Sequence, residues 1–521
     1  MVELSNDFDA IVVGSGFGGS AAALRLSEAG QSVLVLERGR RWRPGEFPRD
    51  VSDVNRLLWR WPAHGNARGL YDVRFFSALG AVVASGVGGG SLIYANIHIR
   101  PDAVIFQDPR WPAEITRATL DPYYDRVRDM LGIAPLPPAL SLPKRDQFRA
   151  AANAIGHEVF DPDQAVSWTD PEVPGRERCQ LVAECEFGCQ HGAKNTLDFT
   201  YLAKAERNGA KVMPGMAVES VAPADSGYRV SVRDTTTGAR MSLSARRVVL
   251  SAGTLGTNEI LLRSRAGGAL PRLSERLGIG YSGNGDFLGS IANSEYDLEP
   301  WKGPDVTSVI RFFDAAPEFT MAAPTFNRGV MLFLARIGQR DPKWLRWAES
   351  FLWRQLPWLV PLVFRSGLLN RARKAAPPDD YAARRLTNLF AIGRDNANGT
   401  IRLKNQRLDI DWNYADENRA LVERMQQAMQ SIATAYRGSY APLATWQLFR
   451  RILTVHSLGG CHLSESPDRG VVSPAGEVHG YPDLFVADGS VIPTSIGFHP
   501  CMTIAAVAER IADGISRRAG R

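Results

Sequence analysis

The stretch FDAIVVGSGFGGSAAALRLSEAGQSVLVLERG, residues 8–39, decides the fold of the first part of this chain. DAIVVG is an apolar run typical of a buried parallel strand, and SAAALRLSEAG has helical spacing that ends at Gly30. A second apolar run, VLVLE, follows directly. The stretch therefore predicts a strand, a glycine turn, a helix and a second strand, which begin a Rossmann-like α/β domain.

The glycine turn carries the pattern of a dinucleotide site. Gly14 permits the tight turn, Gly16 lets the backbone approach a pyrophosphate, and Gly19 allows close packing of helix and strand. Glu37 ends the second strand, where an acidic side chain would hydrogen-bond ribose hydroxyls. The candidate cofactor-binding residues of this stretch are Gly14, Gly16, Phe17, Gly18, Gly19 and Glu37.

Length and composition exclude several classes of protein. A chain of 521 residues exceeds one core, and 45% apolar with 22% charged residues is typical of a folded globular protein. Five cysteines, an odd number, favour a reducing compartment over a secreted disulfide framework. The start MVELSNDFDAIVVGSG shows no export signal, and no window reaches the roughly 18 apolar residues of a membrane span. We expect a cytoplasmic protein with no nucleic-acid partner.

One segment, residues 340–374, concentrates positive charge. It holds eight Lys or Arg against two acidic residues, so its net charge of +6 equals that of the whole chain, and it holds four tryptophans. Pro357 and Pro361 interrupt any long buried helix. The segment predicts a hairpin lying on an anionic membrane, at its inner face, or an apolar lid over a pocket. The alternative is a helix packed on the protein's own core.

Later motifs carry a family resemblance. They are ASGVGGGSLIYAN (84–96), RRVVLSAGTLGTNEILLRS (246–264), NGD (284–286) and DLFVADGSVIPTSIGFHPCMTIAAVAERIADGI (483–515). With them the chain resembles the glucose-methanol-choline (GMC) family of flavoprotein oxidoreductases. It is most similar to the bacterial cholesterol oxidase branch, through GSGFGG, GVGGGSLIYAN and HSLGGC. The resemblance covers residues 8 to about 515.

This resemblance implies a fold of two parts. Residues 1–130, 190–290 and 453–521 would form a Rossmann-like FAD-binding domain of the GMC and glutathione reductase type. Residues 131–189 and 291–452 would form a discontinuous α+β substrate domain with an antiparallel sheet, and would include the 340–374 segment.

The resemblance also implies how FAD is held. Val218 would lie against the adenine, and Asp286 and Asp488 near the pyrophosphate and ribityl chain. Some relatives attach FAD through a histidine in the second glycine loop, where this chain reads GGGSLI, so we expect FAD to be non-covalent. Further candidate cofactor-binding residues are Gly88, Gly89, Ser91, Asn96 and Met502.

By the same resemblance, His456 and His499 are the catalytic pair over the flavin. Alcohol oxidation needs a base for the hydroxyl proton while hydride passes from the carbinol carbon to flavin N5. Histidine suits this role because its ordinary pKa of about 6.5 leaves it largely neutral near pH 7. We assign His456 as the base and His499 as its partner in positioning the alkoxide oxygen. Cholesterol oxidases carry asparagine at the His499 position. Six further histidines are expected to be surface or core residues: His64, His98, His157, His191, His462 and His479.

The predicted substrate is a hydrophobic alcohol: a sterol-like, lipid or long-chain one. Sterol oxidases carry a glutamate that moves the double bond after oxidation, and Ala383 stands at that position here. Oxidation without isomerisation is therefore expected. The alternatives are a lyase of the same family with structural FAD, and a flavin-binding protein without turnover.

Three cysteines stand close together in CQLVAECEFGC, residues 179–189. The spacing of Cys179, Cys185 and Cys189 resembles that of family dehydrogenases with a three-iron four-sulfur (3Fe-4S) cluster, which would pass electrons to a quinone or cytochrome. A structural zinc site with His191 as fourth ligand is a second interpretation. A plain cysteine cluster, or a disulfide formed in air, is the third. Without a cluster, the enzyme would be an oxygen-using oxidase.

Overall fold

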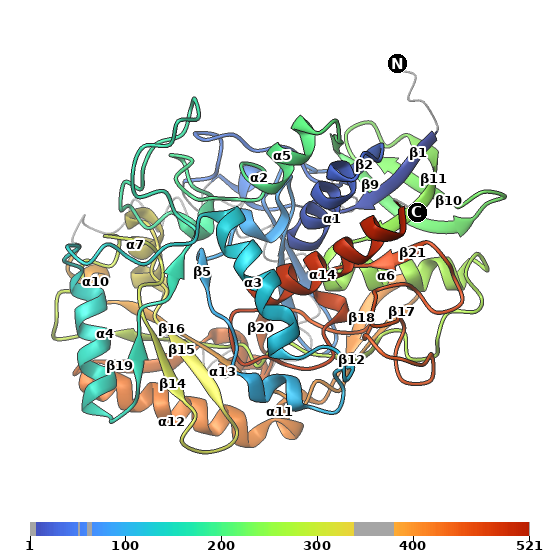
Figure 1. Ribbon diagram of the computed structural model, residues 1–521. Helices are drawn as coiled ribbons and strands as arrows, with labels where there is room; N and C mark the ends of the chain where they lie inside the picture. The colour runs from blue at the N-terminus through green and yellow to red at the C-terminus, as the bar shows by residue number, and fades with distance from the viewer. Residues whose placement is uncertain (1–6, 50–52, 60–64, 338–379, 520–521) are drawn as a thin grey trace.

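The computed structural model describes residues 7–49, 53–59, 65–337 and 380–519 (Figure 1). The opening prediction is confirmed, because β1 (Asp7–Val13), α1 (Phe17–Glu28) and β2 (Val33–Glu37) follow one another as expected. β1 and β2 pair in parallel, with Val13 opposite Leu36. Every residue of β2 is buried, which explains its unbroken apolar pattern.

These strands belong to a seven-stranded sheet drawn from distant parts of the chain. Its order is β8 (Lys211–Pro214), β2, β1, β11 (Arg240–Leu250), β10 (Tyr228–Asp234) and β9 (Met216–Pro223), and β21 (Leu484–Val486) also pairs with β11. β10 and β9 are antiparallel additions to a parallel core. The first and last parts of the chain therefore share one sheet.

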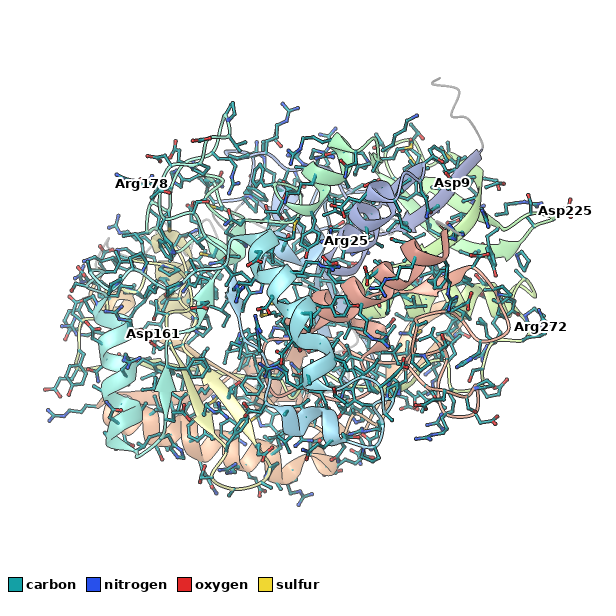
Figure 2. The ribbon with its side chains drawn as sticks, in the orientation of Figure 1. Asp9, Arg25, Asp161, Arg178, Asp225 and Arg272 are labelled. Carbon is teal, nitrogen blue, oxygen red and sulfur yellow. The ribbon has the colours of Figure 1, made fainter. Side chains whose placement is uncertain are left out.

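A buried carboxylate joins the helices beside this sheet. Glu509 lies in α14 (Cys501–Ala519) and has no exposed surface. It accepts hydrogen bonds from Arg25 of α1, whose Nε is 2.7 Å away, and from Tyr201 of α5 (Tyr201–Arg207) at 2.9 Å. Figure 2 shows Arg25 in this region between α1 and α14. Paired in this way, the buried charge links the first helix to the last.

A second, six-stranded sheet is antiparallel throughout. Its order is β19 (Ser439–Pro442), β13 (Phe287–Ala292), β16 (Thr387–Gly393), β15 (Phe319–Ala322), β14 (Val309–Phe312) and β6 (Val159–Phe160). It lies at lower left in Figure 1 with α12 (Arg419–Ala435) beneath it, and the first sheet lies at upper right. The predicted fold class is confirmed, whereas the exact domain boundaries stay a prediction.

The remaining elements connect or flank the two sheets. They include the three-stranded sheets β20-β4-β3 and β12-β17-β18 and the two-stranded pair β5-β7. Their bounds are α2 (Val54–Leu57), β3 (Tyr71–Phe75), β4 (Gly80–Ala84), η1 (Gly89–Leu92), β5 (Ile97–His98), η2 (Ala103–Gln107), α3 (Arg117–Leu131), α4 (Pro143–Ala154), β7 (Asp163–Gln164), η3 (Cys185–Phe187), α6 (Gly253–Ala266), β12 (Ile279–Tyr281), α7 (Arg328–Ile337), α10 (Tyr381–Arg384), β17 (Gly399–Lys404), β18 (Arg407–Asp411), α11 (Tyr414–Glu417), α13 (Ala444–Phe449), β20 (Leu453–Thr454) and η5 (Gly489–Val491).

No helix among the described residues is long and apolar enough to cross a membrane. The basic, tryptophan-rich segment 340–374 lies outside the described residues.

Candidate active site

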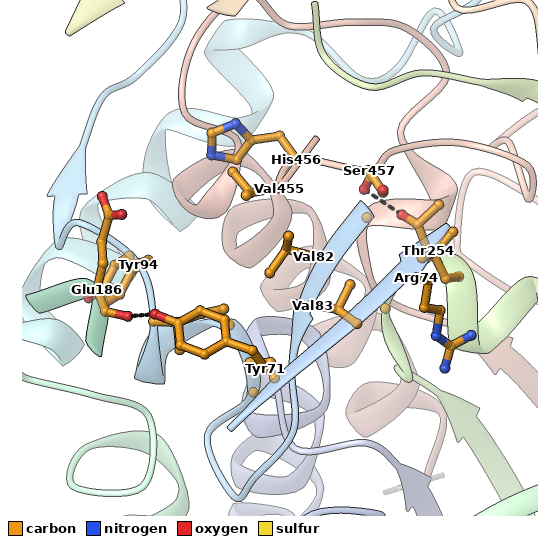
Figure 3. Close-up of a pocket in the computed structure, with 18 of the residues that line it drawn as sticks. Tyr71, Arg74, Val82, Val83, Tyr94, Glu186, Thr254, Val455, His456 and Ser457 are labelled. Carbon is orange, nitrogen blue, oxygen red and sulfur yellow. Dashed lines mark hydrogen bonds between the residues drawn. The ribbon is translucent and has the colours of Figure 1, made fainter. Parts of the chain in front are cut away.

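A cavity of about 1330 Å³ is lined by both large sheets. The glycine turn at residues 14–18 and Glu37 line it from the first sheet. Residues of β13 and β16, among them Leu288 and Phe390, line it from the second sheet. In Figure 3, Glu186 and Tyr94 stand on one side of this cavity, and Thr254 and Arg74 on the other.

Three glycines at this turn, Gly14, Gly18 and Gly19, lie so close to neighbouring backbone that a side chain would not fit. An added Cβ on Gly14 would lie 2.3 Å from the Ser251 carbonyl oxygen, and one on Gly18 would lie 1.5 Å from that of Ala487. Gly19 does not line the cavity; its Cβ would lie 2.0 Å from the Gly14 carbonyl oxygen, as expected for close helix packing. α1 begins after Gly16 without a side-chain cap, so its first N–H groups are available to an anion.

Glu37 is buried at the edge of the cavity. Its Oε2 accepts hydrogen bonds from the Ser15 hydroxyl at 2.6 Å and the Ser15 N–H at 3.2 Å, and its Oε1 accepts from the Gly39 N–H at 2.8 Å. These donors hold the carboxylate in place. Oε1 can accept one further hydrogen bond, so the site fits a ribose hydroxyl.

The second glycine loop meets the first. An added Cβ on Gly89 would lie 2.6 Å from Gly16 Cα, and Gly89 lines the cavity. Ser91 does not line it: its hydroxyl donates to the Gly88 carbonyl at 2.7 Å and accepts from the Leu197 N–H at 3.1 Å. The side chain of Asn96 is fully buried, outside the cavity lining. The second glycine loop is therefore supported on the side away from the cavity by Gly88, Ser91 and Asn96.

Of the other expected cofactor residues, Val218 and Asp488 line the cavity. Asp488 accepts from Thr257 Oγ1 at 2.5 Å and from the hydroxyl of Ser490 at 2.6 Å. Met502 is buried in α14 and lies outside the lining, although Cys501 before it does line the cavity.

His456 and His499, which lie on different segments of the chain, come together as predicted. Their ring centroids are 5.3 Å apart and their planes are nearly perpendicular, at 79°. His456 follows β20, and His499 precedes α14. Both line the cavity, and the His456 side chain is 15% exposed to it (Figure 3). Two imidazoles thus face one space where an alcohol oxygen would fit.

Burial holds the pKa of His499 well below its ordinary value, and the neighbouring His456 and His98 rings lower it further. Its Nδ1 has no hydrogen-bond partner in the part of the chain that the structure describes. His499 is therefore neutral near pH 7 and able to hydrogen-bond a bound oxygen atom.

Asp286 was expected near the pyrophosphate and ribityl chain of the cofactor, but its position in the structure is different. It has no exposed surface and does not line the cavity. Its Oδ1 lies 2.8 Å from Nδ1 of His456 instead. The turn that carries Asp286 packs against His456 on the side away from the cavity. The NGD motif therefore lies near the site without lining the cavity.

Two of the cavity residues that were not predicted, Phe390 and Glu186, stand out by their contacts and charge. Phe390 stacks on His456 with centroids 5.4 Å apart and planes within 5°, and it meets His499 edge-on at 6.2 Å. Glu186 also lines the cavity; burial, followed by the charge of nearby Asp305, raises its pKa to about 8. No cofactor or catalytic motif includes either residue. Phe390 lies in β16, and Glu186 lies within the cysteine-rich stretch 179–189; these positions alone did not indicate a role at the site.

The cysteine cluster does not form the predicted metal site. Cys179, Cys185 and Cys189 are free thiols, and among the described residues no three His, Cys, Asp or Glu side chains could hold a metal ion. Burial raises the pKa of Cys179 to about 11 and that of Cys185 well above its usual range, so both are protonated thiols near pH 7. The structure thus supplies no ligand set for a 3Fe-4S cluster.

The zinc interpretation, with His191 as fourth ligand, is corrected by the same observation, because no three such side chains are grouped in the described residues. Nδ1 of His191 lies 2.9 Å from Oε2 of Glu177, so the ring is directed toward that carboxylate. Cys189 Sγ accepts a hydrogen bond from the Ala193 N–H at 3.3 Å. In the structure the three cysteines are therefore free thiols, and their role stays a prediction.

Comparisons with known proteins agree with this arrangement. Family models described as GMC oxidoreductase match residues 8–280 and 395–508. A cholesterol oxidase of Acinetobacter baumannii is 30% identical over 97% of this chain and 93% of its own length. A long-chain-alcohol oxidase of Arabidopsis thaliana is 25% identical over 97% of this chain and 67% of its own.

A solved structure has the same fold. Pyridoxine 4-oxidase from Mesorbium loti superimposes with a TM-score of 0.64 at 17% identity, covering 97% of this chain and 98% of that one. At this identity the likeness concerns the fold alone.

Proposed function

The chain belongs to the GMC oxidoreductase family, and from that premise we propose that it oxidises a hydrophobic alcohol to a ketone or aldehyde with FAD as its cofactor. The observation that carries this proposal is the pair of facing histidines, His456 and His499, on the same cavity as the glycine turn. Members of the family bind FAD, and the cavity is lined by elements of both large sheets.

The residues present fit a dinucleotide cofactor. The uncapped start of α1 and the bare backbone at Gly14, Gly16 and Gly89 suit its pyrophosphate, and Glu37 suits the adenosine ribose. Val218 and Asp488 border the same cavity. When bound there, FAD would supply the acceptor for the two electrons and the hydrogen that leave the carbinol carbon.

His456 is the proposed base. As the carbinol carbon loses its hydrogen with the bonding electron pair, the hydroxyl proton passes to the imidazole and the C–O bond becomes a carbonyl. His499 stays neutral because of its burial, and it hydrogen-bonds the same oxygen as negative charge develops there. Phe390 stacks on His456 and restricts its rotation.

The substrate class is proposed from the relatives and the cavity. Relatives are named for cholesterol and for long-chain alcohols, both hydrophobic. Ala383 is buried in α10 and does not line the cavity, so the chain offers no carboxyl group at the position expected for isomerisation. We expect a sterol, if accepted, to be oxidised with its double bond left in place, which product analysis by mass spectrometry and NMR tests.

For the electron acceptor, we propose oxygen. The relatives and the solved structure named above are oxidases, and the thiols of Cys179, Cys185 and Cys189 form no ligand group. Hydrogen peroxide formed stoichiometrically with product would support this assignment. Turnover that needs a quinone or a cytochrome, together with iron in anaerobically purified protein, would instead support the dehydrogenase with a cluster.

Anaerobic addition of a hydrophobic alcohol to the FAD-bound protein tests the proposed reaction. A redox enzyme bleaches its flavin absorbance, whereas a lyase with structural FAD, or a flavin-binding protein without turnover, leaves it unchanged. Because GGGSLI lacks a histidine at the attachment position, we also expect acid precipitation to release all FAD into the supernatant. Flavin retained in the pellet would contradict a non-covalent cofactor.

The basic segment 340–374 is proposed to contact an anionic membrane or to cover the substrate. This rests on its sequence, which combines a net charge of +6 with four tryptophans. Binding to anionic but not neutral liposomes at low salt would support the membrane role. No binding, with unchanged kinetics on apolar alcohols after deletion of the segment, would contradict both roles.

A further inference from the structure

A single turn, residues 282–286, contacts His456 and the segment just before His499. All four hydrogen bonds to the Asp286 carboxylate come from residues 454–456: Oδ1 faces Nδ1 of His456 at 2.8 Å. Oδ2 accepts from Thr454 Oγ1 at 2.9 Å, the Val455 N–H at 2.8 Å and the His456 N–H at 3.2 Å. The carboxylate thus holds both the ring and the backbone of His456.

The same turn holds the segment before His499. The Asn284 side chain donates to the Phe498 carbonyl at 2.8 Å, and its Oδ1 accepts from the Ile496 N–H at 2.7 Å. Asn284 is fully buried and has a φ of +55°, in the left-handed region that asparagine tolerates. The two sides of the turn therefore set the separation of the two rings.

Asp395 fixes the backbone of this turn through hydrogen bonds to its carboxylate. Its carboxylate accepts from the Ser282 hydroxyl at 2.7 Å and from the N–H groups of Gly283 and Gly285 at 3.1 and 2.8 Å. An added Cβ on Gly285 would lie 2.4 Å from the Gly393 carbonyl oxygen, so the backbone fits closely against β16. The turn is rigid on the side away from the cavity.

These contacts decide which nitrogen of His456 is the base. Three donors converge on Oδ2 of Asp286, an arrangement that suits an ionised carboxylate accepting on both oxygens. The proton between Oδ1 and Nδ1 then belongs to Nδ1, which leaves Nε2 as the acceptor. A flipped ring would keep its stacking on Phe390 but would place a carbon in front of Asp286 and lose this hydrogen bond.

We propose that the turn Ser282–Asp286 is the positioning element of the histidine pair, with Asp286 selecting the Nδ1–H tautomer of His456 and Asn284 placing His499. This deepens the proposed function and rests on it. The alcohol proton goes to Nε2, and the resulting imidazolium is stabilised by the carboxylate 2.8 Å from Nδ1. Asp286 itself takes no proton.

The first test is spectroscopic and needs no substrate. NMR of ¹⁵N-histidine-labelled, FAD-bound protein should show a protonated Nδ1 and an unprotonated Nε2 for His456, assigned by loss of the signal in His456→Gln. Asp286→Asn should give a mixture of tautomers or the Nε2–H form. An Nε2–H tautomer in the wild-type protein would overturn the proposal.

The second test is kinetic. Asp286→Asn should slow anaerobic flavin reduction by roughly 10²- to 10⁴-fold, the range seen when a histidine loses its orienting carboxylate, with little change in substrate affinity. Thr454→Val, which removes one other hydrogen bond to Asp286, is the matched control and should cost about tenfold at most. Asn284→Gly, which keeps the backbone conformation, should slow reduction without altering the His456 tautomer.

A pH profile separates positioning from mere structural support. In Asp286→Asn the fall in the rate of flavin reduction on the acid side of the pH profile should move to lower pH. The reason is that the His456 imidazolium loses its neighbouring carboxylate. The other titratable groups that face this pair are His499, Asp395, Tyr281 and Tyr414, all unchanged by the variant. A lower melting temperature and FAD content with an unmoved pH profile would overturn the proposal. If no alcohol reduces the wild-type flavin, the proposed function fails while the tautomer measurement still decides the role of Asp286.

Discussion

His456 and His499 differ at the residue scale in what surrounds each ring. His456 has a carboxylate on Nδ1 and a partly exposed edge, so it is suited to accept a proton. His499 is buried, and its pKa is held well below the ordinary value, so it is suited to remain neutral. These surroundings support the two different roles that we propose for the same residue type, base at one position and hydrogen-bonding partner at the other.

We expect His456→Ala to lower the rate of anaerobic flavin reduction by roughly 10²-fold or more, the usual contribution of a positioned base. FAD should be retained, since the ring lies at the cavity wall, whereas the melting temperature should fall because Asp286 loses a hydrogen bond. Stopped-flow absorbance measures the rate. His191→Ala, which changes a half-exposed ring outside the cavity lining, should leave the rate unaltered; equal rates in both variants would remove His456 from the mechanism.

The alkoxide-positioning role of His499 has its own prediction. His499→Leu should slow flavin reduction by roughly 10²-fold, because a buried site for the developing charge loses its hydrogen-bonding group. His499→Asn, the residue of cholesterol oxidases, should retain most of the rate. If leucine and asparagine at this position gave the same rate, hydrogen bonding by residue 499 would be irrelevant.

At the scale of elements, the cofactor site depends on how closely α1 approaches two loops. The Gly18 backbone lies against the Ala487 carbonyl, and Gly14 lies against Ser251. These contacts bring β1, β11 and β21 together at one edge, where the first turn of α1 opens toward the cavity. The glycines are required by tertiary packing as well as by the ligand.

Gly18→Ala should therefore lose most FAD and lower the free energy of unfolding by about 1–3 kcal/mol, because the Cβ would lie 1.5 Å from a backbone oxygen. Gly514→Ala is a matched control in α14: its Cβ would meet nothing within 4 Å. That variant should keep its FAD and gain up to about 1 kcal/mol. Flavin absorbance per chain and urea denaturation measure both effects, and full FAD occupancy in Gly18→Ala would contradict this account.

Across the whole molecule, two histidines outside the catalytic pair affect stability toward acid. Burial lowers the pKa of His98 to about 3. Burial also lowers the pKa of His462 to about 4, partly offset by its hydrogen bond to the Gly280 carbonyl at 3.0 Å. Both rings are neutral in the folded protein at pH values where the unfolded chain would protonate them.

Their contribution to stability is complete above about pH 6.5 and is lost as pH falls toward the folded pKa values, on the order of 5 kcal/mol for His98 and 3 kcal/mol for His462. Unfolding free energy should thus decrease from pH 6.5 to 4. His98→Asn and His462→Asn should each flatten that slope by about one proton, and the double variant by about two. Urea denaturation across this pH range measures the slopes, and slopes identical to wild type would refute the assignment.

The sequence by itself determined the first βαβ unit, the two glycine loops and the histidine pair. Each of these depends on local rules: apolar periodicity, backbone freedom at glycine, and motifs that carry a resemblance. Residues 7–13 and 484–486 are two such apolar runs, and both pair with β11 in one sheet. The family and fold class followed from these features, and the comparisons confirmed both.

Only the tertiary structure decided what the motif residues contact. Asp286 was expected at the cofactor, yet it binds His456, which lies 170 positions later in the chain. The three cysteines have the spacing of ligands, but in the described structure their side chains do not form a group that could hold a metal ion. Phe390 reached the site with no motif at all. Spacing along a chain limits only local geometry, whereas hydrogen-bond partners and burial are set by segments that meet after folding.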